Sequence, residues 1–240
     1  IEFRNVTFVY ENTGIKALDN VSFILNKGET LAILGKTGSG KSTIALLITR
    51  SLEPTSGEIL IDGKNIHELS VESIRNKIGY VPQEAFLFSD SLTNNILFGS
   101  DEVNEQIAEQ FAKKAVVHDN IDNFKERYET VVGERGVTLS GGQKQRVSIA
   151  RALVNDPSIL IFDDSLSAVD TETEEQILNN LSSEIKNKTT IIITHRVSSA
   201  KRADQILVLE DGRVLENGSN SELLNKQGYY YELYNKQLLD

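Results

Sequence analysis

A glycine-rich segment near the N-terminus has the composition and spacing of a phosphate-binding loop. Residues Gly35–Ser42 (the phosphate loop) fit the pattern G-x-x-x-x-G-K-[ST] and lie between the apolar run Leu31–Leu34 and a stretch typical of a helix. Glycine lets the backbone wrap so that several N–H groups and a helix N-terminus face one phosphate chain. We expect phosphate contacts from nine consecutive residues: Gly35, Lys36, Thr37, Gly38, Ser39, Gly40, Lys41, Ser42 and Thr43.

Two side chains of the phosphate loop add specific chemistry. The ammonium group of Lys41 can reach the terminal phosphates of a nucleotide, and the Ser42 hydroxyl can bind Mg²⁺. A carboxylate at the end of a buried strand would complete such a metal site. Four apolar residues, Ile159–Phe162, are followed at once by Asp163. Asp163 is therefore predicted to hold the metal, directly or through water.

A second anion-binding end is predicted in the segment Leu139–Gln143, which precedes a helical stretch. Ser140 is a suitable N-cap, and Gly141 and Gly142 leave backbone N–H groups uncovered. Taken alone, these residues are better explained as a flexible turn with a helix cap than as a phosphate contact. Their place after a phosphate loop, and directly before the strand that ends at Asp163, favours a second phosphate contact.

The elements that must position these groups follow an α/β pattern. Short apolar runs alternate with helix-length amphipathic stretches, which predicts a mainly parallel sheet, and 240 residues can bury a large single core. The candidate buried strands are Leu31–Leu34, Ile59–Ile61, Ile78–Val81, Ile159–Phe162, Thr190–Ile193 and Ile206–Leu209. The candidate helices are Ser42–Leu52, Val71–Asn76, Glu105–Val117, Gln143–Val154, Thr171–Ile185 and Val197–Ala203.

Two regions depart from this alternation. The first thirty residues have the period-two pattern of antiparallel strands, so we predict a β-rich N-terminal subdomain. From about residue 83 to 155 the strand pattern fades and helices dominate. We therefore predict one domain over residues 1–240: a P-loop (RecA-like) α/β core with its β-subdomain in 1–82 and 156–240, and an inserted helical subdomain in 83–155. The aromatic run Tyr229–Tyr234 is predicted to be a helix docked on the core.

Composition excludes several function classes. The chain is 39% hydrophobic and 25% charged, which is not the balance of a disordered protein. It has no cysteine, and so no disulfide, thiolate metal site or cysteine nucleophile. A formal net charge of −10 opposes a broad electrostatic grip on nucleic acid or an anionic membrane. A polyanion must therefore be held locally, as a phosphate loop would hold it.

No apolar run approaches the roughly 20 residues of a membrane span. The chain has no methionine and begins at Ile1 in a strand-like pattern, which predicts a piece of a longer protein.

Six ordered motifs make essentially the whole chain similar to the nucleotide-binding domain of an ATP-binding cassette (ABC) transporter. They are Gly35–Ser42, Gln83, the signature Leu139–Gln143, the strand that ends at Asp163, Ser167–Asp170, and His195 after Ile191–Thr194. The resemblance implies ATP and Mg²⁺ as cofactors. It also implies that the signature acts in trans, so that two domains close head to tail around two ATP molecules. The residues that would cap the γ-phosphate of the other domain are Ser140, Gly141, Gly142 and Gln143.

The resemblance implies roles for four further residues. Tyr10 would stack on adenine, and Gln83 would touch Mg²⁺ or the attacking water and signal toward the membrane domain. His195 would contact the γ-phosphate. Asp170 would lie in the loop that crosses the dimer interface.

Two other segments resemble exporter-type domains, in which they meet coupling helices of the membrane domain: Phe86–Leu92 with Asn95 and Ile96, and Gly133–Gly136. The resemblance thus implies the motor domain of a multidrug or lipid-like exporter. We expect it at the cytoplasmic face of the inner membrane, with a transmembrane domain fused upstream of Ile1. The transported substrate is not encoded in these residues, because the membrane domain selects it.

One position departs from the family pattern. Active members have Glu after the metal-binding Asp, where it orients or deprotonates the attacking water, whereas this chain has Asp164. Its carboxylate falls roughly 1 Å or more short, and such a displacement can cost on the order of 10²-fold in rate. We predict tight ATP binding with slow hydrolysis at this site. The alternative is that backbone adjustment restores normal turnover.

An Asp here resembles the degenerate half of heterodimeric exporters, whose partner is a different subunit carrying the catalytic Glu. An engineered Glu→Asp change would give the same sequence. The alternatives are a near-inactive module that holds ATP as a regulator, and a soluble ABC ATPase that acts on nucleic acid or ribosomes. The acidic charge and the exporter-like segments oppose the last, so no nucleic acid is expected as a partner.

Overall fold

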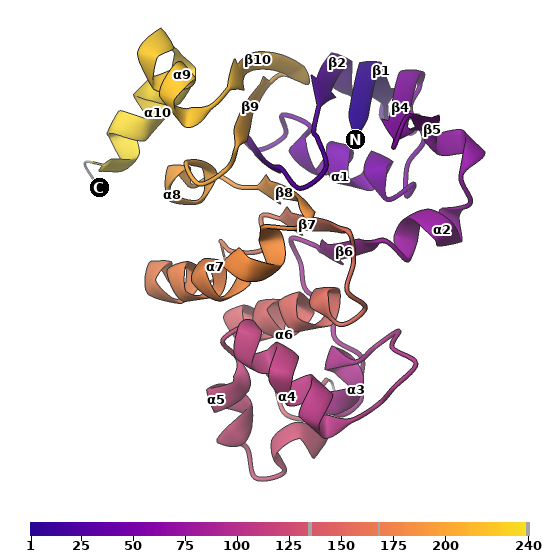
Figure 1. Cartoon of the computed structure of the whole chain (residues 1–240), viewed down its shortest axis with the longest axis vertical. Coiled ribbons are helices and arrows are strands. Elements are labelled where there is room, and N and C mark those ends of the chain that lie inside the picture. Colours follow the sequence, from indigo (N-terminus) through magenta and orange to yellow (C-terminus); the bar gives the residue numbers. More distant parts are fainter. Residues whose placement is uncertain (134–135, 168, 239–240) are drawn as a thin grey trace. The chain divides into compact units, whose positions relative to one another are not determined.

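The computed structural model describes residues 1–133, 136–167 and 169–238. The chain divides into two compact units, one of residues 1–76 with 188–240 and one of residues 77–187 (Figure 1). Each unit contains strands and helices. No helix among the described residues is both long enough and apolar enough to cross a membrane.

The first unit begins with an antiparallel sheet whose strand order is β2-β1-β4-β5. Its strands are β1 (Glu2–Val9), β2 (Lys16–Ile24), β4 (Ser56–Ile61) and β5 (Lys64–Asn65). Register shifts interrupt strict alternation in β1 and β2, but most of their apolar residues are buried, and the rings of Phe3 and Phe23 stack with centroids 4.5 Å apart. The predicted N-terminal β-subdomain is confirmed. The candidate strand Ile59–Ile61 also belongs to it, because β4 pairs antiparallel with β1 rather than joining the parallel strands.

The first unit also holds the strands that carry the phosphate loop, in the order β10-β9-β3-β8. They are β3 (Thr30–Gly35), β8 (Thr189–Ile193), β9 (Gln205–Glu210) and β10 (Arg213–Gly218). Strand β3 is fully buried and pairs in parallel with β8 and β9, as its unbroken apolar pattern predicts. Strand β10, which pairs antiparallel with β9, was not predicted, because its half-exposed residues lack an apolar run.

The helices of the first unit are α1 (Lys41–Ile48), α2 (Val71–Arg75), α8 (Val197–Ala200), α9 (Asn220–Lys226) and α10 (Tyr229–Leu238), with a 3₁₀ turn η1 (Ile66–Glu68). Helix α10 is docked as predicted: Tyr230 is fully buried in a cluster with β3, β9, α8 and α9, and its hydroxyl donates to Asn220. The Glu216 carboxylate accepts the first backbone N–H groups of the helix, from Tyr229 and Tyr230.

The second unit contains a pair of parallel strands and most of the helices. Its elements are β6 (Ile78–Val81), α3 (Leu92–Ile96), α4 (Glu105–Lys114), α5 (His118–Asp122), the 3₁₀ turn η2 (Arg127–Glu129), α6 (Gly141–Leu153), β7 (Ile159–Asp163) and α7 (Thr171–Ile185). Helices α3 and α4 pack along α6, and α6 contacts β6 (Figure 1). The predicted helical insert is confirmed. The short helices α3 and α5 were not predicted.

Val116, two residues after the end of α4, has a strained backbone conformation. This residue has φ 56°, a left-handed value that β-branched side chains disfavour by about 1–2 kcal/mol. Its carbonyl nevertheless accepts a hydrogen bond from the Arg146 guanidinium on α6, which fixes the turn against that helix.

We expect Val116→Asn to raise the free energy of unfolding by about 1 kcal/mol, because Asn tolerates left-handed backbone far better than Val. Denaturant titration of the two proteins measures the difference. Val103→Asn is the matched control, since Val103 is 61% exposed and lacks a positive φ. An equal change in both variants would show that Val116 stores no strain.

Candidate functional site

The phosphate loop leaves β3 along a path that only glycine permits at two points. A Cβ on Gly35 would lie 2.3 Å from the backbone oxygen of Leu209, on the neighbouring strand β9. Gly40 has φ 96°, and a Cβ there would lie 2.2 Å from the backbone oxygen of Ala17 on β2. Both glycines are therefore required for the loop to curl over the end of β3.

The Lys41 side chain lies inside the phosphate loop. Its ammonium group donates to the carbonyl oxygens of Gly35 and Lys36, both at 2.8 Å, and the residue is only 6% exposed. Helix α1 starts at Lys41, and its N-cap, Gly40, has no side chain with which to cap the first turn. The loop thus presents a cation and a helix N-terminus together, the combination that binds phosphate.

The Ser39 hydroxyl gives an independent test of whether a phosphate chain fits this loop. Ser39 is 4% exposed, and its Oγ is buried with no hydrogen-bond partner. A buried hydroxyl without a partner costs about 1–3 kcal/mol, so such groups are rare unless a ligand completes them. A phosphate oxygen would accept this hydrogen bond, and the loop therefore fits the group its sequence implies.

Three further predicted residues lie in the same unit as the phosphate loop. The Tyr10 hydroxyl lies 3.4 Å from the Thr43 hydroxyl on α1, and its ring packs edge-on against Phe8. His195 follows β8, whose pairing with β3 brings the chain after both strands to one edge of the sheet. The Gln237 side chain holds this turn, because its amide donates to the His195 carbonyl and its oxygen accepts from Val197 N–H.

The predicted carboxylates lie in the second unit, at the end of β7. Asp163 is 3% exposed, and its Oδ2 accepts a 3.1 Å hydrogen bond from the Tyr80 hydroxyl on β6. Burial and the Asp163 carboxylate raise the pKa of Tyr80 well above its ordinary value, so the phenol stays protonated and donates. Asp164 follows with φ 47°, and its carbonyl accepts from the Ser167 hydroxyl at 2.6 Å.

Gln83 follows β6, and a residue that the sequence did not single out fixes its backbone. The side-chain amide of Gln145, on α6, donates to the carbonyls of Pro82 and Gln83 at 3.2 and 2.6 Å. Gln145 is 2% exposed, and its Oε1 is buried without a partner. A polar residue on the apolar face of α6 was the signal available in the sequence. It links the signature helix to the turn that carries Gln83.

The signature opens α6 as predicted. The Ser140 hydroxyl accepts from the Gln143 N–H, and the Gln143 side chain accepts from the Ser140 N–H, which is a complete capping box. Asp170 caps α7 in a similar way, and hydrogen bonds from Thr173 hold the pKa of its carboxyl below the usual range. Three residues of the predicted motifs, Glu134, Arg135 and Ala168, lie outside the described residues.

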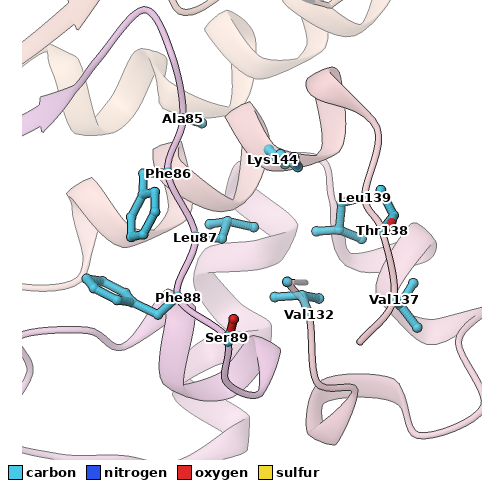
Figure 2. A pocket seen from close by; sticks show the side chains of 11 residues that line it. Ala85, Phe86, Leu87, Phe88, Ser89, Val132, Val137, Thr138, Leu139 and Lys144 are labelled. Carbon is cyan, nitrogen blue, oxygen red and sulfur yellow. The ribbon is translucent and has the colours of Figure 1, made fainter. Parts of the chain in front are cut away.

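An apolar cavity of about 490 Å³ lies beside the signature and is lined by residues 85–89, 132–133 and 137–139 together with Lys144 (Figure 2). Leu87 and Leu139 point toward each other across it, and Phe86 and Phe88, which also line it, are 66% and 39% exposed. Arg151 anchors this segment from α6, because its guanidinium donates to the Phe86 carbonyl at 3.0 Å. Phe86 and Phe88 therefore form an exposed apolar surface at the start of the predicted exporter-like segment, whereas Leu92, Asn95 and Ile96 of that segment are buried.

The structure thus groups the predicted residues in two sets. The phosphate loop, Tyr10 and His195 belong to the first unit, and Gln83, the signature, Asp163 and Asp164 belong to the second. The approach of the second set to the phosphate loop stays a prediction, as does every ligand contact.

Comparison with known proteins gives a consistent result. A model of the ABC transporter family matches residues 18–167. The chain is 46% identical over 240 residues to the uncharacterized ABC transporter ATP-binding protein YknU of Bacillus subtilis (strain 168). It is 43% identical over 238 residues to the ATP-dependent lipid A-core flippase of Escherichia coli (strain K12). These matches cover 100% and 99% of this chain and 41% of each relative.

The fold of the chain also matches that of a solved structure. A bacterial Atm1-family ABC exporter with ATP bound matches with a TM-score of 0.93 and 43% identity, over 98% of this chain and 41% of that chain. The match confirms the predicted P-loop α/β core, N-terminal β-subdomain and helical insert. The chain belongs to the ABC transporter family, and its fold is that of the nucleotide-binding domain of an ABC exporter.

Proposed function

We propose that the chain binds Mg-ATP at the phosphate loop and hydrolyses it slowly, as one half of a closing pair of nucleotide-binding domains. The observation that carries this proposal is the buried Lys41 ammonium, surrounded by a loop that two glycines press against β2 and β9. The partnerless Ser39 hydroxyl supports it as well. Tyr10 supplies an aromatic ring for the adenine, held at the start of α1 through Thr43.

Within this proposal, the binding of the phosphates and of Mg²⁺ is assigned to particular residues. The Lys41 ammonium and the first N–H groups of α1 would bind and orient the phosphates. Ser42, Asp163 and Gln83 would hold Mg²⁺, which neutralises charge on the phosphate oxygens when bound. Phosphate oxygens and water would supply the remaining ligands, as is usual for Mg²⁺.

Asp164 and His195 would act on the water that attacks the γ-phosphate. The shorter carboxylate of Asp164 places its oxygens roughly 1 Å farther from that water than Glu would, which supports slow turnover. His195 would donate to the γ-phosphate. A binding module that holds ATP while a partner does the chemistry is the second candidate, and Asp164 is the observation that favours it.

Two partners are part of this proposal. The first is another nucleotide-binding domain, a different subunit with Glu at the position of Asp164, whose ATP the signature of this chain would cap. The second is a transmembrane domain, because the chain spans 41% of the length of each of the two relatives and exposes the apolar surface around Phe86 and Phe88. The work would then be export of a drug or lipid-like molecule, at the cytoplasmic face of the inner membrane.

Complementation between two variants tests the shared site. Lys41→Ala disables the phosphate loop and keeps the signature. Gly141→Asp places a negative charge at the signature and keeps the loop, and a Cβ at Gly141 meets no atom within 4 Å, so the fold tolerates it. We expect that neither variant alone associates when ATP is added, whereas a mixture of the two does, because one intact composite site forms.

Light scattering after size exclusion, with and without ATP, measures this association. A mixture that stays monomeric, while the unaltered chain dimerises with ATP, would rule out the head-to-tail arrangement. Salt-sensitive binding of DNA or RNA would instead favour the ATPase that acts on nucleic acid.

A further inference from the structure

Tyr80 and Asp163 are hydrogen-bonded although 83 positions separate them in the sequence. Tyr80 pairs with Ile161 in the parallel ladder of β6 and β7. Residues two apart on a strand share a face, so Tyr80, Ile161 and Asp163 all point to the same side of the strand pair. The phenol spans the roughly 6.6 Å that two residues cover along β7 and ends at Asp163 Oδ2.

We propose that Tyr80 is a positioning residue for the metal-binding carboxylate. Its hydroxyl fixes one oxygen of Asp163 and so sets the rotation of the carboxylate about its Cβ–Cγ bond. This inference rests on the proposed role of Asp163 in holding Mg²⁺. Hydrogen bonds of this kind orient metal ligands in many sites, and their loss typically costs about 10–100-fold in metal affinity or activity.

The surroundings of Tyr80 and Asp163 indicate that the tyrosine orients the carboxylate rather than merely filling space. Asp163 is 3% exposed, so little water is available to hold its oxygens in place. The other residues of β6 are Ile78, Gly79 and Val81, and an aliphatic side chain at position 80 would continue that strand equally well. Within the Tyr80 side chain, the hydroxyl at the far end of the ring is the group that reaches the carboxylate.

Binding of Mn²⁺, a paramagnetic substitute for Mg²⁺, tests the inference in the 240-residue chain saturated with ATP. The free ion is counted by electron paramagnetic resonance, and ATP affinity is measured separately in EDTA. Tyr80→Phe removes one oxygen and keeps the ring. We expect it to raise the Kd for Mn²⁺ about tenfold and to leave the metal-free ATP affinity unchanged. Tyr231→Phe, a half-buried tyrosine of α10, is the matched control and should change neither value.

Asp163→Asn completes a double-mutant cycle and separates the positioning role of Tyr80 from the metal-binding role of Asp163. If Tyr80 acts through Asp163, Tyr80→Phe causes no further loss of Mn²⁺ in the Asp163→Asn background. An unchanged Kd in Tyr80→Phe, the same fold loss in both backgrounds, or weaker ATP binding in EDTA would overturn the role of Tyr80. Unaltered Mn²⁺ binding by Asp163→Asn alone would overturn the metal site itself.

Discussion

Lys41→Ala is expected to lower the rate of ATP hydrolysis by about 10²–10³-fold, because it removes the only side-chain cation that the loop encloses at its centre. A preorganised donor to a developing charge is worth that much in well-studied enzymes. The ammonium is already held by the carbonyls of Gly35 and Lys36, so it needs little reorganisation when phosphate arrives. Affinity for ATP should fall as well, by at least tenfold.

Steady-state hydrolysis and equilibrium binding of ATP by the unaltered chain and the variant give both numbers. Lys27→Ala is the control, since Lys27 is an exposed residue before β3 and outside the phosphate loop. Equal losses in the two variants would mean that general positive charge, rather than the ammonium of Lys41, binds the nucleotide.

Gly40→Ala is expected to abolish measurable ATP binding and to lower the free energy of unfolding by about 3 kcal/mol. The added methyl would lie 2.2 Å from the Ala17 carbonyl oxygen and 2.8 Å from Leu18 Cδ2, and neither the strand backbone nor the buried Leu18 can move aside cheaply. The left-handed φ of 96° adds strain of its own. The loop would have to leave its place over β3.

Gly38→Ala is the matched comparison within the same loop. Gly38 also has a left-handed φ, 82°, but a Cβ there meets no atom within 4 Å. It should therefore cost only about 1 kcal/mol of stability and keep most of the ATP affinity. Thermal unfolding and ATP titration of both variants measure the contrast. Variants that behave alike would show that backbone strain, and not the close approach to β2, decides the effect.

Local patterns predicted the elements on which the site stands. The apolar run before Gly35 forms β3, and the run before Asp163 forms β7. The signature starts α6. Each of these elements was predictable because a glycine, an Asp or an N-cap Ser marks its end or its start in the sequence. The end of α1 was predicted four residues too late, at Leu52. Arg50 takes a left-handed φ of 50°, and the Ser51 N–H donates to the Leu46 carbonyl. These features terminate the helix although no Gly or Pro at this point marks its end in the sequence.

Contacts between distant residues could not be predicted in this way. The hydrogen bond from Tyr80 to Asp163 depends on the register of β6 against β7, and the two amide bonds of Gln145 depend on α6 packing beside the turn after β6. Strand β4 was placed with the parallel strands because a short apolar run does not reveal its partner. The motif residues were predictable from sequence, whereas the residues that hold them were not.

The proposed slow turnover depends on Asp164. Its left-handed φ of 47° suits Asp better than Glu, so the backbone at this position accepts the shorter side chain at little cost. Replacing it with Glu should cost a few tenths of a kcal/mol in stability and return the carboxylate to the attacking water. The rate difference of about 10²-fold corresponds to about 2.7 kcal/mol in the barrier.

The most direct test of slow hydrolysis is the rate of γ-phosphate release in a single turnover. It is measured for the unaltered chain and for Asp164→Glu, each saturated with Mg-ATP. We predict slow release by the unaltered chain and a gain on the order of 10²-fold in Asp164→Glu, with unchanged ATP affinity. Rapid release by the unaltered chain, with no gain on substitution, would contradict the account.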